Sequence, residues 1–124
     1  RIKSRLTLEN CDRSFTPSDL YEVCCVTGVP LVYDVHHHRC LPDGQSIQEA
    51  TEMALTTWGN REPLFHISSP RDGWDSKNPR PHHDYIFEED YPTEWHNLQT
   101  PFTLDVEAKH KELAVLRLKN FLES

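Results

Sequence analysis

The sequence predicts an α/β fold in which parallel strands alternate with helices. Short apolar runs recur along the chain, and clear helix-start signals follow two of them. Strand–helix alternation at this spacing requires crossover connections, so the strands that it joins run parallel. We therefore expect the 124 residues to form one domain around one sheet.

Four apolar runs are short enough to be strands and are bounded by polar or turn-forming residues. They cover residues 6–8, 30–33, 64–67 and 102–106. A closed (β/α)8 barrel has eight such strands and takes about 250 residues. The strands and helices predicted here correspond to half of such a barrel.

Two helices have start signals that can be read directly. Thr16 can cap the first, with Pro17 at its first helical position, and Gly28 can end it. Ser46 can cap the second, and Glu49 completes the capping box three residues later. This second helix is predicted to extend to residue 59.

The chain after the third strand has a different composition. Residues 69–100 are rich in Pro, Asp, His and aromatic residues and have little helical periodicity, so we predict a long loop that is functional or disordered. A third helix is predicted over residues 109–122. Lys109 and Lys111 would then be solvated residues of that helix.

Charge and composition limit the possible functions. The formal net charge is −7, the wrong sign for holding DNA by counter-charge alone unless bound cations offset it. No apolar run approaches the roughly 20 residues of a membrane helix. A GxxxxGK[ST] phosphate loop is missing, so we expect no nucleotide cofactor, and without a CxxC pair a zinc ribbon is not expected.

Acidic or imidazole side chains occur at or near the C-terminal end of every predicted strand. Glu9 follows the first strand, and Asp34 and His37 follow the second. His66 lies on the third strand, His82 and His83 lie in the loop after it, and Glu107 follows the fourth strand. In parallel barrels this end of the strands carries the active site. A shared divalent metal cluster would compensate the cost of burying these groups together. Mixed carboxylate and imidazole ligands suit Mn, Zn or Fe better than Ca or Mg.

Each of these residues has an ordinary interpretation when taken alone. A glutamate that ends a strand is usually solvated, and a histidine in an apolar run is usually a hydrogen-bonded core residue. Their joint position at successive strand ends is what predicts the metal site.

Some weaker features suggest contact with a nucleic acid. Ser68, Ser69 and Arg71 could contact a phosphate, Arg71 by a bidentate interaction, although a plain turn fits equally well. Trp58, Trp74 and Trp95 could stack on bases, but core packing or loop anchoring is the favoured interpretation.

Five motifs together resemble the UV-damage endonucleases of DNA repair. They are Leu-Glu-Asn at 8–10, Asp-Val-His-His-His-Arg at 34–39, His-Ile-Ser-Ser-Pro-Arg at 66–71, His-His-Asp-Tyr-Ile at 82–86, and Glu-Ala-Lys-His-Lys-Glu-Leu at 107–113. They occur in the family's order and correspond to its second half. The resemblance implies that residues 1–124 are the C-terminal half of a (β/α)8 barrel, and so a fragment of a longer chain.

The resemblance also implies an activity and a ligand set. It implies a cluster of up to three metals, commonly manganese, with Zn²⁺ or Mg²⁺ as alternatives. It implies nicking of UV-damaged double-stranded DNA just 5′ to a pyrimidine dimer or 6-4 photoproduct. The implied metal ligands are Glu9, Asp34, His37, His66, His82 and Glu107, and the carboxylates Glu9, Asp34 and Glu107 are the implied catalytic residues. The family's spacing to the following Asp84 favours His82 over His83.

The sequence departs from the family at one position and covers one half of it. Some members carry a modified, metal-bridging lysine where this chain has Leu64. The first half is expected to contribute further histidine ligands and the residues that wedge into DNA, so the chain alone is expected to be inactive. A protein of this kind would work in the cytoplasm of a prokaryote, or in the nucleus or mitochondria of a eukaryote.

Other functions share parts of this pattern. An apurinic-site endonuclease or a sugar isomerase of the same barrel class would use the same kinds of strand-end ligands. A non-catalytic fragment would expose open sheet edges and hold an incomplete ligand set.

Overall fold

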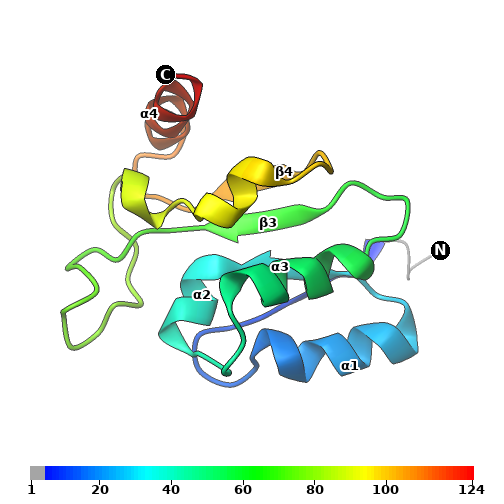
Figure 1. The fold of residues 1–124 in the computed structure, drawn as a ribbon. Helices are drawn as coiled ribbons and strands as arrows, with labels where there is room; N and C mark the ends of the chain where they lie inside the picture. Colours follow the sequence, from blue (N-terminus) through cyan, green and yellow to red (C-terminus); the bar gives the residue numbers. More distant parts are fainter. Residues whose placement is uncertain (1–4) are drawn as a thin grey trace.

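The computed structural model describes residues 5–124 and has the predicted α/β architecture (Figure 1). Its elements are, in chain order, β1 (Leu8–Glu9), α1 (Pro17–Thr27), β2 (Leu31–Asp34), α2 (Val35–Cys40), α3 (Ile47–Thr56), β3 (Leu64–Ile67), the 3₁₀ helices η2 (Glu88–Asp90) and η3 (Thr93–Asn97), β4 (Thr103–Val106) and α4 (Glu112–Glu123). None of the helices in these residues is both long and apolar enough to cross a membrane.

All strands of the described sheet are parallel and follow one another in sequence order, β1-β2-β3-β4. Glu9 pairs with Val32, and Asp34 pairs with His66. The carboxyl ends of the strands therefore meet at one edge. This is the sequential strand order of half of a (β/α)8 barrel, as predicted.

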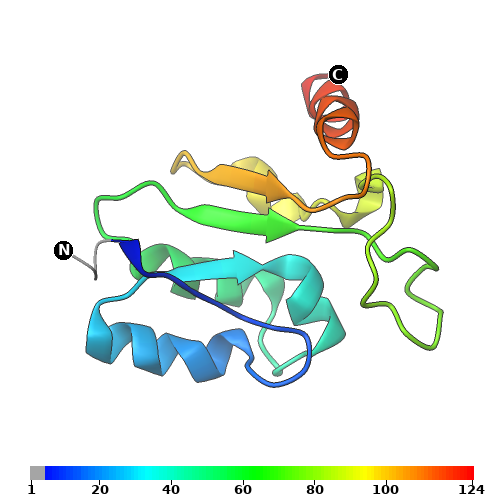
Figure 2. The same cartoon turned by 180° about the vertical axis from the view of Figure 1, so that it is seen from behind.

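The helices cover one face of this sheet. Helix α3 and the 3₁₀ helices lie in front of the strands in Figure 1 and behind them in Figure 2. The side chains that point to this face, such as Tyr33, Phe65 and Ile67, are fully buried. On the other face, Thr103 and Asp105 are exposed. The exposed face is the one that points to the interior of a closed barrel.

Capping explains where α1 and α3 begin. Thr16 accepts a hydrogen bond from the backbone N–H of Asp19 and donates its own backbone N–H to the Asp19 carboxylate. Ser46 and Glu49 form the same reciprocal pair at α3. Gly28 ends α1 with a φ of 75°, a conformation that costs glycine little. All of these boundaries were predicted.

Some boundaries were predicted incorrectly. Helix α3 ends at Thr56 rather than at residue 59, and α4 begins at Glu112. Lys109 and Lys111 therefore precede the helix, although both are exposed as expected. Helix α2 was not predicted, because its six residues are too few for a helical periodicity to be recognised.

The region predicted as a long loop contributes to the core. Tyr91 and Trp95 from this region are buried, and the Trp95 ring stacks on Phe65 with 5.1 Å between ring centroids. The indole N–H of Trp95 donates to the hydroxyl of Thr51 on α3, at 3.0 Å. The aromatic side chains thus tie an irregular segment to the sheet.

The other tryptophans are also held by the protein. Trp58 is buried and donates its N–H to the carbonyl of Leu31 at 2.8 Å. Trp74 is 36% exposed and donates to the carboxylate of Asp90 at 2.9 Å, which anchors its loop. Core packing and loop anchoring, the favoured interpretations, are confirmed for these side chains.

We predict that Trp95→Ala destabilises the protein by about 3–5 kcal/mol, the usual cost of truncating a buried aromatic residue. It removes the stack on Phe65 and leaves Thr51 without its partner. Urea unfolding followed by circular dichroism measures this. Trp74→Ala is the matched control and should cost clearly less, since this ring is partly exposed. Equal losses for the two variants would contradict the assignment of Trp95 to the core.

Candidate metal centre

The parallel sheet places one candidate ligand from every strand at the same edge. Glu9 ends β1, Asp34 ends β2, His66 lies on β3 and Glu107 directly follows β4. The register of the strands sets Asp34 beside His66. The convergence of these residues follows from the topology, since parallel strands end on the same side.

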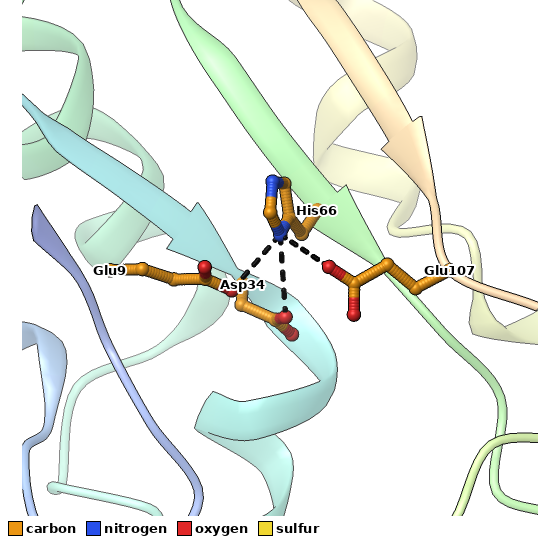
Figure 3. A group of neighbouring side chains, drawn as sticks. All are labelled: Glu9, Asp34, His66 and Glu107. Carbon is orange, nitrogen blue, oxygen red and sulfur yellow. Dashed lines mark ion pairs between the residues drawn. The ribbon is translucent and has the colours of Figure 1, made fainter. Parts of the chain in front are cut away.

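These side chains form a tight cluster (Figure 3). Glu9, Asp34, His66 and Glu107 each offer one ligand atom, and these atoms all lie within 4.8 Å of one another. The Nδ1 atom of His66 lies 2.9 Å from Glu9 Oε2 and 2.8 Å from Glu107 Oε1. Its distance to Asp34 Oδ2 is 3.9 Å.

His37 and His82 border this cluster. The Nδ1 atom of His37 lies 3.3 Å from Asp34 Oδ2, and the Nε2 atom of His82 lies 4.0 Å from Glu107 Oε2. The structure therefore brings all the predicted ligands together, although these histidines lie outside the tight group. His83 is turned into its own loop, where its Nδ1 accepts the backbone N–H of Tyr85 at 3.1 Å.

Two buried atoms of the cluster lack the partners that buried polar atoms normally have. Asp34 Oδ2 and His66 Nδ1 form no hydrogen bond with any described residue. The short contacts of His66 to Glu9 and Glu107 are therefore ion pairs without hydrogen-bond geometry. A carboxylate and imidazole set of this kind fits a divalent cation such as Mn²⁺, Zn²⁺ or Fe²⁺.

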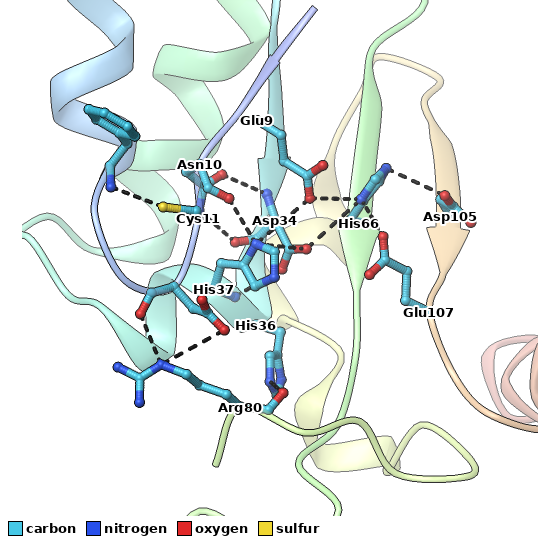
Figure 4. Close-up of polar contacts among 12 residues, drawn as sticks. Glu9, Asn10, Cys11, Asp34, His36, His37, His66, Arg80, Asp105 and Glu107 are labelled. Atoms are coloured by element: carbon cyan, nitrogen blue, oxygen red, sulfur yellow. Dashed lines mark hydrogen bonds and ion pairs between the residues drawn. The ribbon is translucent and has the colours of Figure 1, made fainter. Parts of the chain in front are cut away.

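Asn10 holds the centre in place by joining β1 to β2 (Figure 4). Its side chain is fully buried, accepts from the backbone N–H of Asp34 at 2.8 Å and donates to the Asp34 carbonyl at 2.9 Å. The Asn10 carbonyl accepts from His37 Nδ1 at 2.8 Å, which leaves Nε2 as the nitrogen of His37 that can bind a metal. Asp34 also caps α2 by accepting from the backbone N–H of His37.

Asn10 and Asp105 also support the site, and neither was predicted from the sequence as a supporting residue. Asp105 lies beside His66 in the register of β3 and β4, with 3.4 Å between its Oδ2 and His66 Nε2. Two features of the sequence could have indicated them. Asn10 directly follows Glu9, and side chains alternate between the two faces of a strand, so Asp105 and Glu107 lie on the same face.

The electrostatics of the cluster favour an added positive charge. Burial raises the pKa of Asp34 to about 7. Burial lowers the pKa of His66, but Glu107 and Glu9 outweigh it and raise this pKa to about 10. His66 in turn holds the pKa of Glu107 below its ordinary value. Without a metal, the protonated imidazole is the cation of the cluster.

The prediction that Ser68 and Ser69 contact a phosphate does not agree with their positions. Both side chains are fully buried, and Ser69 Oγ accepts from the backbone N–H of Phe87 at 2.8 Å. Arg71 is exposed, but its guanidinium pairs with the neighbouring Asp72 at 3.2 Å. Both serines follow β3 directly into the interior, and Ser69 supports the loop through its hydrogen bond with Phe87.

Comparisons with known proteins place the chain in a family. The family described as UV-endonuclease UvdE matches residues 1–124. UV DNA damage endonucleases from Bacillus mycoides and Nostoc sp. are 35% and 36% identical and are matched over 94% and 97% of this chain. The chain spans 38% and 37% of the length of these relatives.

A solved structure matches as well. The crystal structure of SacUVDE superimposes with a TM-score of 0.82 at 27% sequence identity, over 97% of this chain and 40% of that chain. Because the family match covers the whole length and these relatives are matched over nearly the whole chain, the chain belongs to the UV-endonuclease UvdE family.

Proposed function

We propose that this chain carries part of the active site of a metal-dependent DNA repair endonuclease. The enzyme would cut the phosphodiester backbone of UV-damaged double-stranded DNA on the 5′ side of cyclobutane dimers and 6-4 photoproducts. The observation that supports this best is the group of Glu9, Asp34, His66 and Glu107, whose ligand atoms lie within 4.8 Å of one another. Membership of the UvdE family supports the substrate class.

The proposed ligands differ in what their burial allows them to do. Asp34 is 0% exposed at its side chain, so its role is to hold a cation and to orient His37 through the cap of α2. Glu9 and Glu107 are 34% and 31% exposed and face solvent, so either can also accept a proton from the attacking water. His66 is the central imidazole ligand, and His37 and His82 are the peripheral ones.

A divalent metal cluster would supply the charge that neutralises the phosphate and acidifies the attacking water. Mn²⁺ is the preferred candidate for this mixed ligand set, with Zn²⁺ and Mg²⁺ as alternatives. UV lesions stack and pair poorly, so displacing them from the duplex costs less than displacing normal bases. Recognition can therefore depend on the deformability of the DNA.

The chain spans less than two fifths of the length of these relatives. We propose that residues 1–124 form the C-terminal half of a (β/α)8 barrel. The other half would cover the exposed face of the sheet and add ligands. The protein would act wherever the chromosome lies, in the cytoplasm of a bacterium such as those that contain the relatives above.

The first test is a nicking assay with the complete gene product on UV-irradiated and abasic duplexes. Glu107→Gln should lower the nicking rate by more than about 100-fold. Replacing a residue that only hydrogen-bonds to a metal ligand already lowers activity by about 10–100-fold, and replacing the ligand itself should lower it further. The substitution removes a charged ligand and keeps the shape of the side chain. Glu22→Gln, on the exposed surface of α1, is the matched control and should keep the full rate.

Mapping of the products separates the alternatives. Cuts at abasic sites alone would indicate an apurinic-site endonuclease, and full activity of Glu107→Gln or in excess chelator would contradict the mechanism. Residues 1–124 expressed alone should bind metal but not nick DNA, since they form an open half of the barrel.

The second test is proton release on metal binding. The raised pKa of His66 keeps its imidazole protonated at neutral pH, but a metal needs the neutral nitrogen. Mn²⁺ binding should therefore release protons, and the affinity should rise with pH until the pH passes about 10, the pKa of His66. Calorimetry in buffers with different ionisation enthalpies measures this. Binding at pH 7 without proton release would show that His66 is not a ligand.

A further inference from the structure

A groove of about 470 Å³ opens directly beside the candidate metal centre. One wall comes from the loop before His82, and the other comes from the segment after β4. The lining residues are Arg80, Pro81, His82, Glu107, Ala108 and Lys109. Glu107 belongs to the metal cluster and His82 borders it, so the groove and the cluster are continuous.

Backbone hydrogen bonds hold the two walls together. The N–H of Lys109 donates to the carbonyl of His83 at 3.2 Å, and the N–H of His110 donates to the carbonyl of Asp84 at 3.1 Å. On the other side, the carbonyl of Pro81 accepts from the N–H of Arg71 at 2.7 Å. The groove is therefore preformed, and a ligand does not have to order it.

Lys109 is the cation that this groove can offer to a ligand. Its side chain is exposed and forms no ion pair within residues 5–124. Arg80 is engaged elsewhere: its Nε donates to the carbonyl of Asp12 at 3.1 Å and lies 3.8 Å from the Asp12 carboxylate.

We propose that the groove binds a DNA backbone phosphate next to the one at the metal centre, with Lys109 as its cationic partner. This rests on the proposed function, which makes DNA the substrate. The strand must continue from the reacting phosphate over adjacent surface, and lysine is a compact point charge that suits phosphate. Pro81 and Ala108 also line the groove, and the sugar between the two phosphates would lie against their apolar side chains.

Contacts with flanking phosphates position a strand without reading its sequence. A single cation at this place would therefore set the register of the DNA on the metal centre. It would also contribute to affinity for damaged and undamaged duplexes alike, in a manner that depends on salt.

The test compares Lys109→Ala and Lys109→Arg with Lys77→Ala in the complete gene product. Lys77 is an exposed lysine that does not line the groove. Binding to an undamaged duplex is measured by fluorescence anisotropy over a salt series. Lys109→Ala should weaken binding several-fold and reduce the slope of log K against log salt by about 0.9. Lys109→Arg should keep the wild-type slope, Lys77→Ala should change nothing, and the Mn²⁺ affinity should stay the same in all variants.

A wild-type salt slope in Lys109→Ala would overturn the proposal, as would a wild-type protein that binds no DNA. A large loss of Mn²⁺ affinity in Lys109→Ala would also overturn it, because Lys109 would then serve the metal centre. The outcome is separable from the endonuclease assay. If Lys109→Ala changes the salt slope but the complete gene product nicks no UV-damaged DNA, only the proposed endonuclease activity is contradicted. If the gene product nicks UV-damaged DNA but Lys109→Ala keeps the wild-type salt slope, only the proposed phosphate site in the groove is contradicted.

Discussion

Asp34 imposes the main physical constraint on this structure, because its carboxylate is fully buried beside other acidic groups. Its Oδ2 atom has no hydrogen bond within the described residues, and burial raises its pKa to about 7. The other oxygen, Oδ1, accepts from the backbone N–H of His37, but leaving Oδ2 buried without a hydrogen bond costs about a few kcal/mol, on the order of other polar-transfer penalties. Glu9 and Glu107 add like charges within 4.8 Å. The arrangement is stable only when a positive charge sits among the three carboxylates, either the imidazolium of His66 or a metal.

The rest of the fold serves to hold this charge concentration in place. Parallel strands in sequence order bring one acidic or imidazole group from each strand end to the same edge. The buried Asn10 bonds to both backbone groups of Asp34, so the ends of β1 and β2 cannot separate without breaking two hydrogen bonds. The aromatic contacts of Trp95 hold the long irregular segment against the back of the sheet. The loop that carries His82 is held separately, because the N–H of Arg71 donates to the carbonyl of Pro81 and the N–H of His83 donates to the carbonyl of Ser69, both at 2.7 Å.

The sequence predicted the sheet and the candidate ligands because both depend on simple periodic features. Strand-end residues such as Glu9 and Glu107 are identified by their place after an apolar run, and Ser46 and Glu49 identify a capping box. Helix α2 could not be predicted, because it is nucleated by the Asp34 cap and by packing rather than by its own pattern. The burial of Ser68 and Ser69 could not be predicted either, since it depends on where residues 69–100 pack. The same holds for the groove beside Lys109, which exists only once the chain has folded.

The strand-end carboxylates and His66 are proposed to bind the same divalent metal cluster. Anomalous X-ray diffraction tests this most directly. Crystals of the complete gene product grown with Mn²⁺ would be measured on both sides of the manganese absorption edge. We expect an anomalous peak in direct coordination with Glu9, Asp34, His66 and Glu107, and further peaks toward His37 and His82. Saturating Mn²⁺ with no peak at this cluster, and His66 still paired to the carboxylates, would contradict the account.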